Sequence, residues 1–160
     1  MRTLDRLFAA AILSAVTSIV VAPSAFSLAS SPAQENRSSR TYVQNLPAEV
    51  RASLRKYTKA CGDELTAASG FSRFIDVGRL RLIALHFHDL RCVGRDTFCD
   101  SGKCLHQVYM SHGGRYHLVM SVQANEITLT SLDTTPAIEV EYDHGRQRTW
   151  RWSGNRFVDR

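Results

Sequence analysis

The stretch LHQVYMSHGGRYHLVMSVQANEITLTSL, residues 105–132, decides the fold class. It contains three short runs of β-branched, aromatic and other apolar residues, at 105–111, 116–122 and 126–132. The runs are separated by the sequences SHGG and QAN, which are typical of hairpin turns. The stretch therefore predicts consecutive antiparallel strands, which together form a β-meander.

Similar runs lie on both sides of this stretch and extend the predicted meander. They are divided by Gly, Asp, Asn or Pro, which favour turns. We therefore expect six to eight antiparallel strands in all. The flanking candidates are residues 71–77, 80–90, 137–142, 149–152 and a short tail at 156–158.

One helix is predicted before the strands. Between Val50 and Cys61 apolar residues recur at helical spacing, while Arg and Lys occupy the other side. Pro47 is typical of a helix start and Gly62 of a helix end. A helix of about three turns packed on one face of the meander gives an α+β domain.

The first 29 residues have the three parts of a secretory signal. A start with two Arg residues precedes the apolar run Leu7–Ala22, and small residues follow as far as Ala29. The run is short for a membrane span, which needs roughly 20 apolar residues. We expect cleavage after Ala29, with Ser24 and Ser27 as alternative positions.

Cleavage would leave a polar, disordered linker at 30–45 and one domain at 46–160, located in the periplasm or secreted. The whole chain carries a net charge of +5, and its basic residues are scattered. No nucleic-acid recognition motif is present, and we expect no nucleic-acid partner. We also expect a monomer that is not an integral membrane protein after cleavage.

Four Cys residues, Cys61, Cys92, Cys99 and Cys104, all follow the signal. An even number in an exported domain favours two disulfides, for which three connectivities exist. Cys99 and Cys104 flank the turn-like sequence DSGK, which would let their thiols meet across a hairpin. Cys61 and Cys92 would then form the second bond. The spacing does not match that of structural zinc sites.

The segment LRCVGRDTFCDSGKC at 90–104, with Cys61 before it and WRWSGNRF at 150–157 after it, resembles a group of small exported bacterial proteins. In that group a helix and a strand each end near Cys, a C-G-x-G-G-C-like turn follows, and a W-x-W-x-G-x-x-Y/F strand closes the domain. The resemblance covers about residues 46–158. It implies export, pairing of Cys99 with Cys104, and the meander. It implies no activity, because the group is largely uncharacterised.

The chain departs from this group at two places. Many members carry an acidic D-x-N-x-D-G loop where this chain reads IDVGRLR, at 75–81. One carboxylate and two Arg residues cannot supply the oxygen ligands of calcium, so we predict no calcium site there. Asp100 and Lys103 also replace Gly residues of the Cys-bearing turn.

Histidines provide the sharpest candidate for chemistry. His86 and His88 are two residues apart on a predicted strand, so both side chains would share one face and could hold a metal ion. Asp89 would point the other way. His106 or His117 could add a third ligand if their strands lie alongside. The alternative is that His86 and His88 line the polar face of a half-buried strand.

No catalytic residues are apparent. The mature chain has no G-x-S-x-G nucleophile motif, and Cys residues in disulfides cannot act as nucleophiles. Glu139 and Glu141 share a strand face that is typical of a solvated sheet edge. Trp150 and Trp152 also share a face, which would be part of the core or, if exposed, a platform for carbohydrate or peptide.

These patterns favour an exported, non-enzymatic envelope protein without a cofactor, which acts as a structural or binding module for an unknown envelope protein or glycan. The alternative is a periplasmic metal-binding protein or hydrolase that uses the His cluster. Convergence of His86 and His88 with a third ligand would favour the metal, whereas a large exposed apolar patch would favour a binding module.

Overall fold

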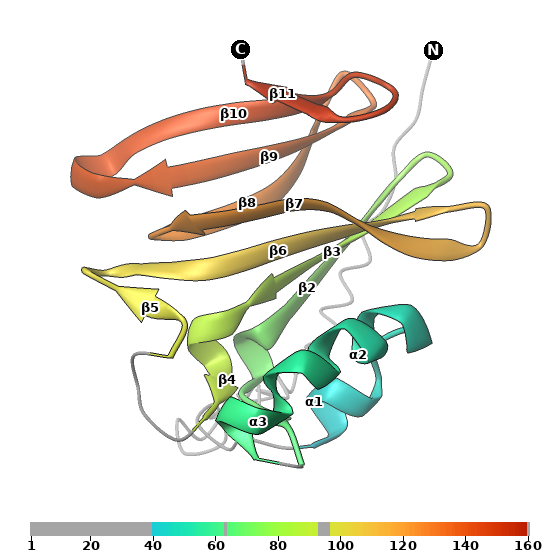
Figure 1. The fold of residues 1–160 in the computed structure, drawn as a ribbon. Coiled ribbons are helices and arrows are strands. Elements are labelled where there is room, and N and C mark those ends of the chain that lie inside the picture. The colour runs from blue at the N-terminus through green and yellow to red at the C-terminus, as the bar shows by residue number, and fades with distance from the viewer. Residues whose placement is uncertain (1–39, 63, 93–96, 160) are drawn as a thin grey trace, which may run out of the picture. The chain divides into compact units, whose positions relative to one another are not determined.

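Two antiparallel sheets dominate the structure, a computed structural model that describes residues 40–62, 64–92 and 97–159 (Figure 1). The predicted signal at 1–29 and most of the predicted linker lie outside the described residues. Within them the chain forms eleven strands, so the expectation of six to eight strands in one meander was wrong. The three additional strands are pairs of residues, too short to produce a periodic sequence pattern.

The first sheet has the order β2-β3-β6-β5, and β7 pairs with β6 as well. The second sheet has the order β8-β9-β10-β11, so the expected meander is divided between two sheets. A two-stranded pair, β1 with β4, completes the set. The bounds are β1 Thr66–Ala67, β2 Ser72–Val77, β3 Leu80–His86, β4 Leu90–Arg91, β5 Cys99–Asp100, β6 Lys103–His112, β7 Arg115–Ala124, β8 Glu126–Leu132, β9 Thr135–Tyr142, β10 Arg146–Trp152 and β11 Phe157–Asp159.

The expected helix is present as a 14-residue run that ends, as predicted, at Cys61. It consists of α2 Ala48–Leu54, the 3₁₀ segment η1 Arg55–Tyr57, and α3 Thr58–Cys61. A further short helix, α1 Thr41–Gln44, lies within the segment expected to be a linker. The folded part therefore begins before residue 46, because Val43 is buried in the core and holds α1 against it.

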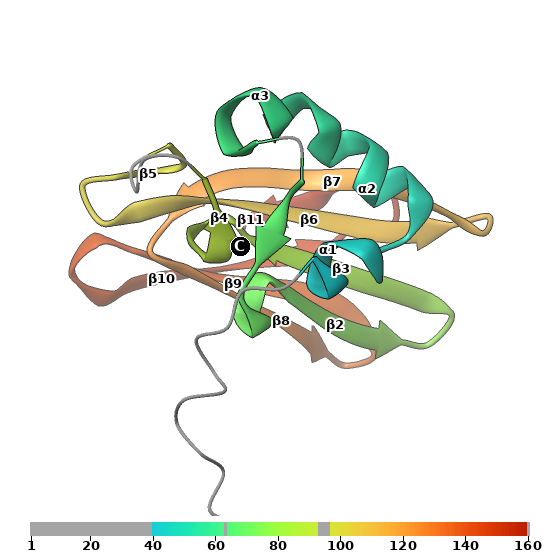
Figure 2. The same ribbon diagram turned by 90° about the horizontal axis from the view of Figure 1, so that it is seen from below.

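Three layers result, with helices on one face of the first sheet and the second sheet on its other face (Figure 1). Figure 2 shows α2 running beside β7. Along β3, Ile83 and Leu85 face the helices, whereas Leu82 and Ala84 face the second sheet. This alternation is that of a strand buried on both faces.

Strand β3 ends at His86, so the strand predicted at 80–90 is interrupted. The 3₁₀ turn η3, Phe87–Asp89, separates β3 from β4. Phe87 turns into the helix-side core, where its ring packs edge-on against Tyr57 and Phe98, with ring centroids 5.0 Å apart in each pair. The chain leaves the sheet in η3, where His88 was expected to continue the strand.

The structure contains two disulfides, Cys61–Cys92 and Cys99–Cys104. The first joins the end of α3 to the residue after β4, and the second links β5 to β6. The turn between β5 and β6 places Ser101 and Gly102 at positive φ, as a two-residue hairpin turn requires. Two disulfides indicate an oxidising, extracytoplasmic environment. In the described part of the chain, no helix has the length and hydropathy needed to cross a membrane.

Candidate metal centre

His86 and His106 are direct cross-strand partners at the end of the β3–β6 pairing. His86 lies two residues after Ala84, and His106 two residues before Val108, so both side chains share the face that looks toward the second sheet. Both are buried, with exposed fractions of 5% and 0%. The pairing of two long strands therefore holds two imidazoles side by side in the interior.

His88 joins them from the turn η3 and not from the strand. The expectation that His86 and His88 share a face through strand alternation was therefore wrong in its geometry. The turn nevertheless brings the His88 ring centroid within 5.8 Å of His86 and 5.9 Å of His106, while His86 and His106 are 5.1 Å apart. One nitrogen from each of the three rings lies within 4.8 Å of the others, so the rings converge at the spacing of a metal site.

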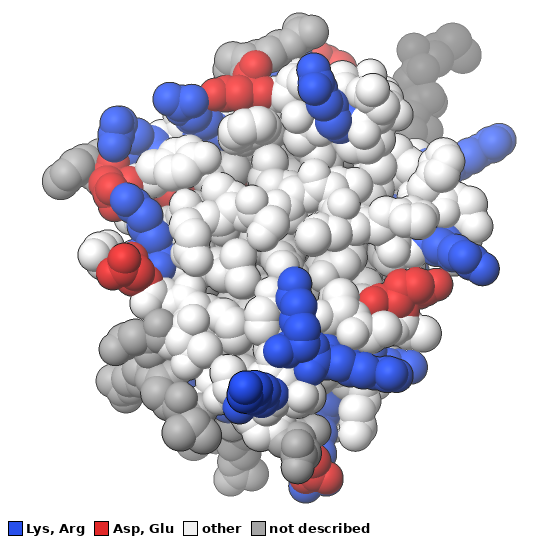
Figure 3. Space-filling view, viewed as in Figure 1, with Lys and Arg blue, Asp and Glu red and all other residues white. Residues whose placement is uncertain are grey.

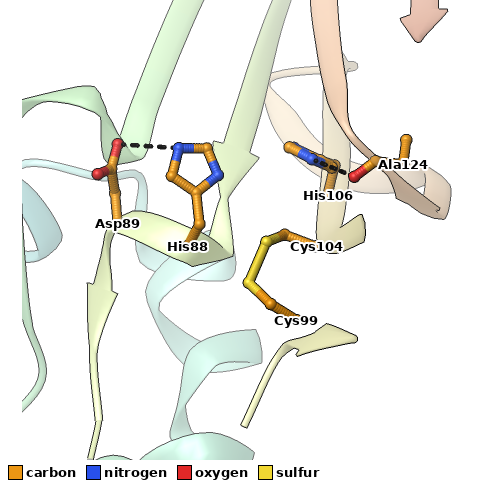
Figure 4. Close-up of a disulfide and its surroundings, with 6 residues drawn as sticks. All are labelled: His88, Asp89, Cys99, Cys104, His106 and Ala124. Atoms are coloured by element: carbon orange, nitrogen blue, oxygen red, sulfur yellow. Dashed lines mark hydrogen bonds and ion pairs between the residues drawn. A yellow bond between two sulfur atoms is a disulfide. The ribbon is translucent and has the colours of Figure 1, made fainter. Parts of the chain in front are cut away.

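His86 and His106 each have an acceptor at hydrogen-bond distance on the outer side of the ring, and His88 has a more distant carboxylate there. His86 Nδ1 lies 2.9 Å from Glu126 Oε1 on β8, and His106 Nε2 lies 3.2 Å from the carbonyl oxygen of Ala124. His88 Nε2 lies 3.5 Å from Asp89 Oδ2, as Figure 4 shows. Outer acceptors of this kind fix the tautomer and the orientation of metal-binding His residues.

The inner nitrogens are left without partners. His86 Nε2 and His106 Nδ1 are both buried and form no hydrogen bond with any described residue. In Figure 4 the remaining ring nitrogen of His88 lies on the side of His106. An unpaired buried polar atom costs about 1–3 kcal/mol, and native structures rarely retain one without a reason. Three converging lone pairs would be satisfied together by one cation.

The pKa values of His106 and Glu126 are both shifted in the direction that favours binding of a cation. Burial, followed by the neighbouring His86, lowers the pKa of His106 to about 4, so its imidazole is neutral at physiological pH. Burial alone would raise the pKa of Glu126, but hydrogen bonds from His86 and from the Ile127 amide lower it to about 2. A neutral imidazole such as that of His106 is the form in which His binds a metal.

A pocket of about 350 Å³ opens beside the His86 and His88 rings. Gly70, from the 3₁₀ turn η2 Ser69–Phe71, forms part of its wall together with Asp89. A Cβ atom on Gly70 would collide with Asp89 Oδ2, the atom that faces His88. The missing side chain at position 70 therefore lets Asp89 reach His88. The pocket is lined by Gly70, Arg73, Phe74, His86, His88, Asp89, Glu126, Ile127, Thr128 and Leu129.

The other residues singled out from the sequence lie elsewhere. His117 is exposed on β7 opposite Met110, whereas His106 pairs with Val122 near the other end of the same ladder, so His117 cannot be the third ligand. Trp150 and Trp152 are half-buried and pack against the core between the two sheets, so they do not form an exposed platform.

Three residues around the site were not identified from the sequence. Glu126 follows an ordinary hairpin turn, and only the packing of β8 on β3 brings it to His86. Asp89 was expected to point away, which would hold only if the strand continued past His86. The need for Gly at position 70 could not be read from the sequence, because Gly70 in η2 meets Asp89 in η3 only in the folded structure.

Comparison with known proteins adds no family or relative. No protein-family model matches the chain, and neither a curated protein nor a solved structure matches it.

Proposed function

We propose that this protein binds a divalent transition-metal ion, zinc in the simplest case, through His86, His88 and His106. One observation carries the proposal. Two of the three inner nitrogens are buried without any partner, although the outer nitrogens of the same rings are held by Glu126 and Ala124. Because buried polar groups in native structures are mostly paired, the two unpaired inner nitrogens support a ligand that binds to both.

The donor set selects the class of ion. Imidazole nitrogens suit zinc, copper, nickel and cobalt, whereas calcium and magnesium require oxygen ligands. Asp76 lies where many members of the group that this chain resembles carry an acidic loop, and Arg81 binds both of its oxygens at 2.6 and 2.9 Å. Three protein ligands also leave a position for water, as in catalytic zinc sites, so hydrolysis is the chemistry to test once binding is established.

The proposed location is the periplasm or the exterior of the cell. The signal-like sequence at 1–29, the two disulfides and the resemblance to small exported proteins support it. The oxidised Cys residues also leave the metal to the His residues, because metals bind the Cys thiolate and a disulfide has none.

A binding module for an envelope protein or glycan receives less support. Among the described residues the exposed large hydrophobic side chains are Phe74 and Leu118. They lie on β2 and β7, with the buried strands β3 and β6 between them, so they do not form one patch. On the face shown in Figure 3, charged side chains lie around a broad uncharged centre, and several basic ones lie together below it.

Calorimetric titration of the purified, oxidised protein with zinc tests the proposal. We expect one zinc ion per chain. His88→Ala should weaken binding by more than the roughly 10- to 100-fold cost of losing an outer partner. His88 is suited to this test because it is exposed, so its loss leaves the core intact. His117→Ala is the matched control and should bind as the wild type does. Absence of binding, or equal binding by His88→Ala and wild type, would contradict the proposal.

A further inference from the structure

We infer that the open coordination position of this metal takes a small oxyanion, a carboxylate or a phosphate, whose second oxygen is bound by Arg73. The inference rests on the proposed metal site and names the class of ligand that it would accept. Arg73 was not among the residues that the sequence indicated.

Arg73 lies on β2, the edge strand next to β3, and pairs with Ala84. Ala84 precedes His86 by two residues, so Arg73 and His86 lie on the same face of the sheet. Both residues line the pocket of about 350 Å³, which is large enough for a small ligand. Arg73 therefore borders the same pocket as the proposed ligands His86 and His88.

The side chain of Arg73 is exposed and forms no hydrogen bond or ion pair with any described residue. By contrast, Arg40, Arg81 and Arg148 each pair with a carboxylate. Asp89 lies close, since a Cβ on Gly70 would meet both Asp89 and Arg73, but its Oδ2 faces His88. The guanidinium thus remains available to a ligand.

The formal charges around the pocket also favour an anionic ligand. A bound dication and Arg73 carry three formal positive charges, and Asp89 and Glu126, which line the same pocket, carry two formal negative ones. One positive charge remains in the pocket, which a monoanion would neutralise. An uncompensated charge in a partly enclosed space favours binding of an ion of opposite sign.

The accessibility of the three ligands shows where the anion would approach. His86 and His106 are buried, whereas the His88 side chain is 37% exposed. The ion would therefore be reached from the pocket, past His88. A carboxylate or phosphate can place one oxygen on the metal and present another to the fork of guanidinium N–H groups, which suits planar oxyanions better than an ammonium does.

The test uses the cobalt(II)-loaded full protein, whose visible absorption reports the coordination of the metal. Acetate and inorganic phosphate are titrated separately at constant ionic strength, so that the two arms distinguish a carboxylate from a phosphate ligand. We expect a saturable spectral change with at least one of them. Arg73→Gln should weaken that anion roughly 10- to 100-fold, the value of a charge-assisted hydrogen bond.

Two further variants complete the experiment. Arg73→Lys, which keeps the charge but loses the fork, should lie between wild type and Arg73→Gln. Arg79→Gln, in the exposed turn between β2 and β3, should equal the wild type. Failure to bind cobalt would overturn the metal site itself. Cobalt binding without a response to either anion, or an equal response in wild type and Arg73→Gln, would overturn the oxyanion inference alone.

Discussion

His86 and His106 are paired across β3 and β6, and in each ring one nitrogen has a fixed acceptor while the other has none. The pairing sets the distance between the rings, and Glu126 and the Ala124 carbonyl set their orientation. Cys104 lies two residues before His106 on β6 and is tied to β5 (Figure 4). Two of the proposed ligands are therefore positioned on rigid elements before any ion binds.

The position of His88, the third proposed ligand, depends on Gly70 through Asp89, and Gly70→Ala tests this dependence. The added methyl group would displace the Asp89 carboxylate that faces His88 Nε2. Loss of an outer partner typically lowers metal affinity by roughly 10- to 100-fold, and we expect zinc affinity to fall within that range. Titration with zinc measures the effect.

Ser69→Ala is the matched control, because Ser69 is exposed in the same 3₁₀ turn. Gly70 does not adopt a positive φ, so Ala is compatible with the backbone and the variant should fold. Wild-type zinc affinity in Gly70→Ala would show that Asp89 does not position His88.

The strand pattern was predictable because it is local. Runs such as 105–111 and 126–132 are rich in β-branched and other apolar residues, which favour strands, and each corresponds to a strand. The division into two sheets was not predictable. The turn QAN, which joins β7 to β8, resembles a hairpin turn, although it connects strands of different sheets. Pairing across the molecule depends on burial that a single stretch of sequence does not reveal.

The site was predictable only in part, for the same reason. His86, His88 and His106 stand out by residue type, and the disulfides by number and spacing. The contacts that give the cluster its character arise from tertiary packing, including Glu126 on His86 and Arg73 beside the pocket. His88 reaches the cluster from the 3₁₀ turn η3 and not, as expected, from a continuing strand.

Removal of the two disulfides should have different consequences. Cys61–Cys92 spans 31 residues and Cys99–Cys104 spans 5. In the chain-entropy model these loops contribute about 3–4 and about 2 kcal/mol, respectively, to the free energy of unfolding. The paired Cys→Ser changes at 61 and 92 should therefore lower stability in urea by more than those at 99 and 104.

The two disulfide variants should rank in the opposite order when zinc affinity is measured. Cys104 lies on β6 beside His106, whereas Cys61 and Cys92 lie on the helix side of the first sheet. Loss of Cys99–Cys104 should weaken zinc more, although it costs less stability. If both measurements ranked the variants in the same order, the second disulfide would have no special role in positioning His106.

Acid should destabilise the metal-free protein through His106. Its pKa is about 4 in the folded state, lowered from 6.5 chiefly by burial. Between these values the unfolded chain binds a proton that the folded chain does not, so the free energy of unfolding decreases as pH falls from 6.5 to 4. The full difference is about 3 kcal/mol, since one pKa unit corresponds to about 1.4 kcal/mol.

Urea unfolding in the presence of a chelator, at several pH values from 7.5 to about 4.5, measures this loss. Glu126 contributes in the same direction only at lower pH, because its pKa falls from 4.5 to about 2 on folding. His106→Gln is the control, since an amide can still donate to the Ala124 carbonyl but does not titrate. The variant should lose most of the pH dependence between 6.5 and 4.5, whatever its stability at pH 7.5. An unchanged slope would assign the acid sensitivity to other groups.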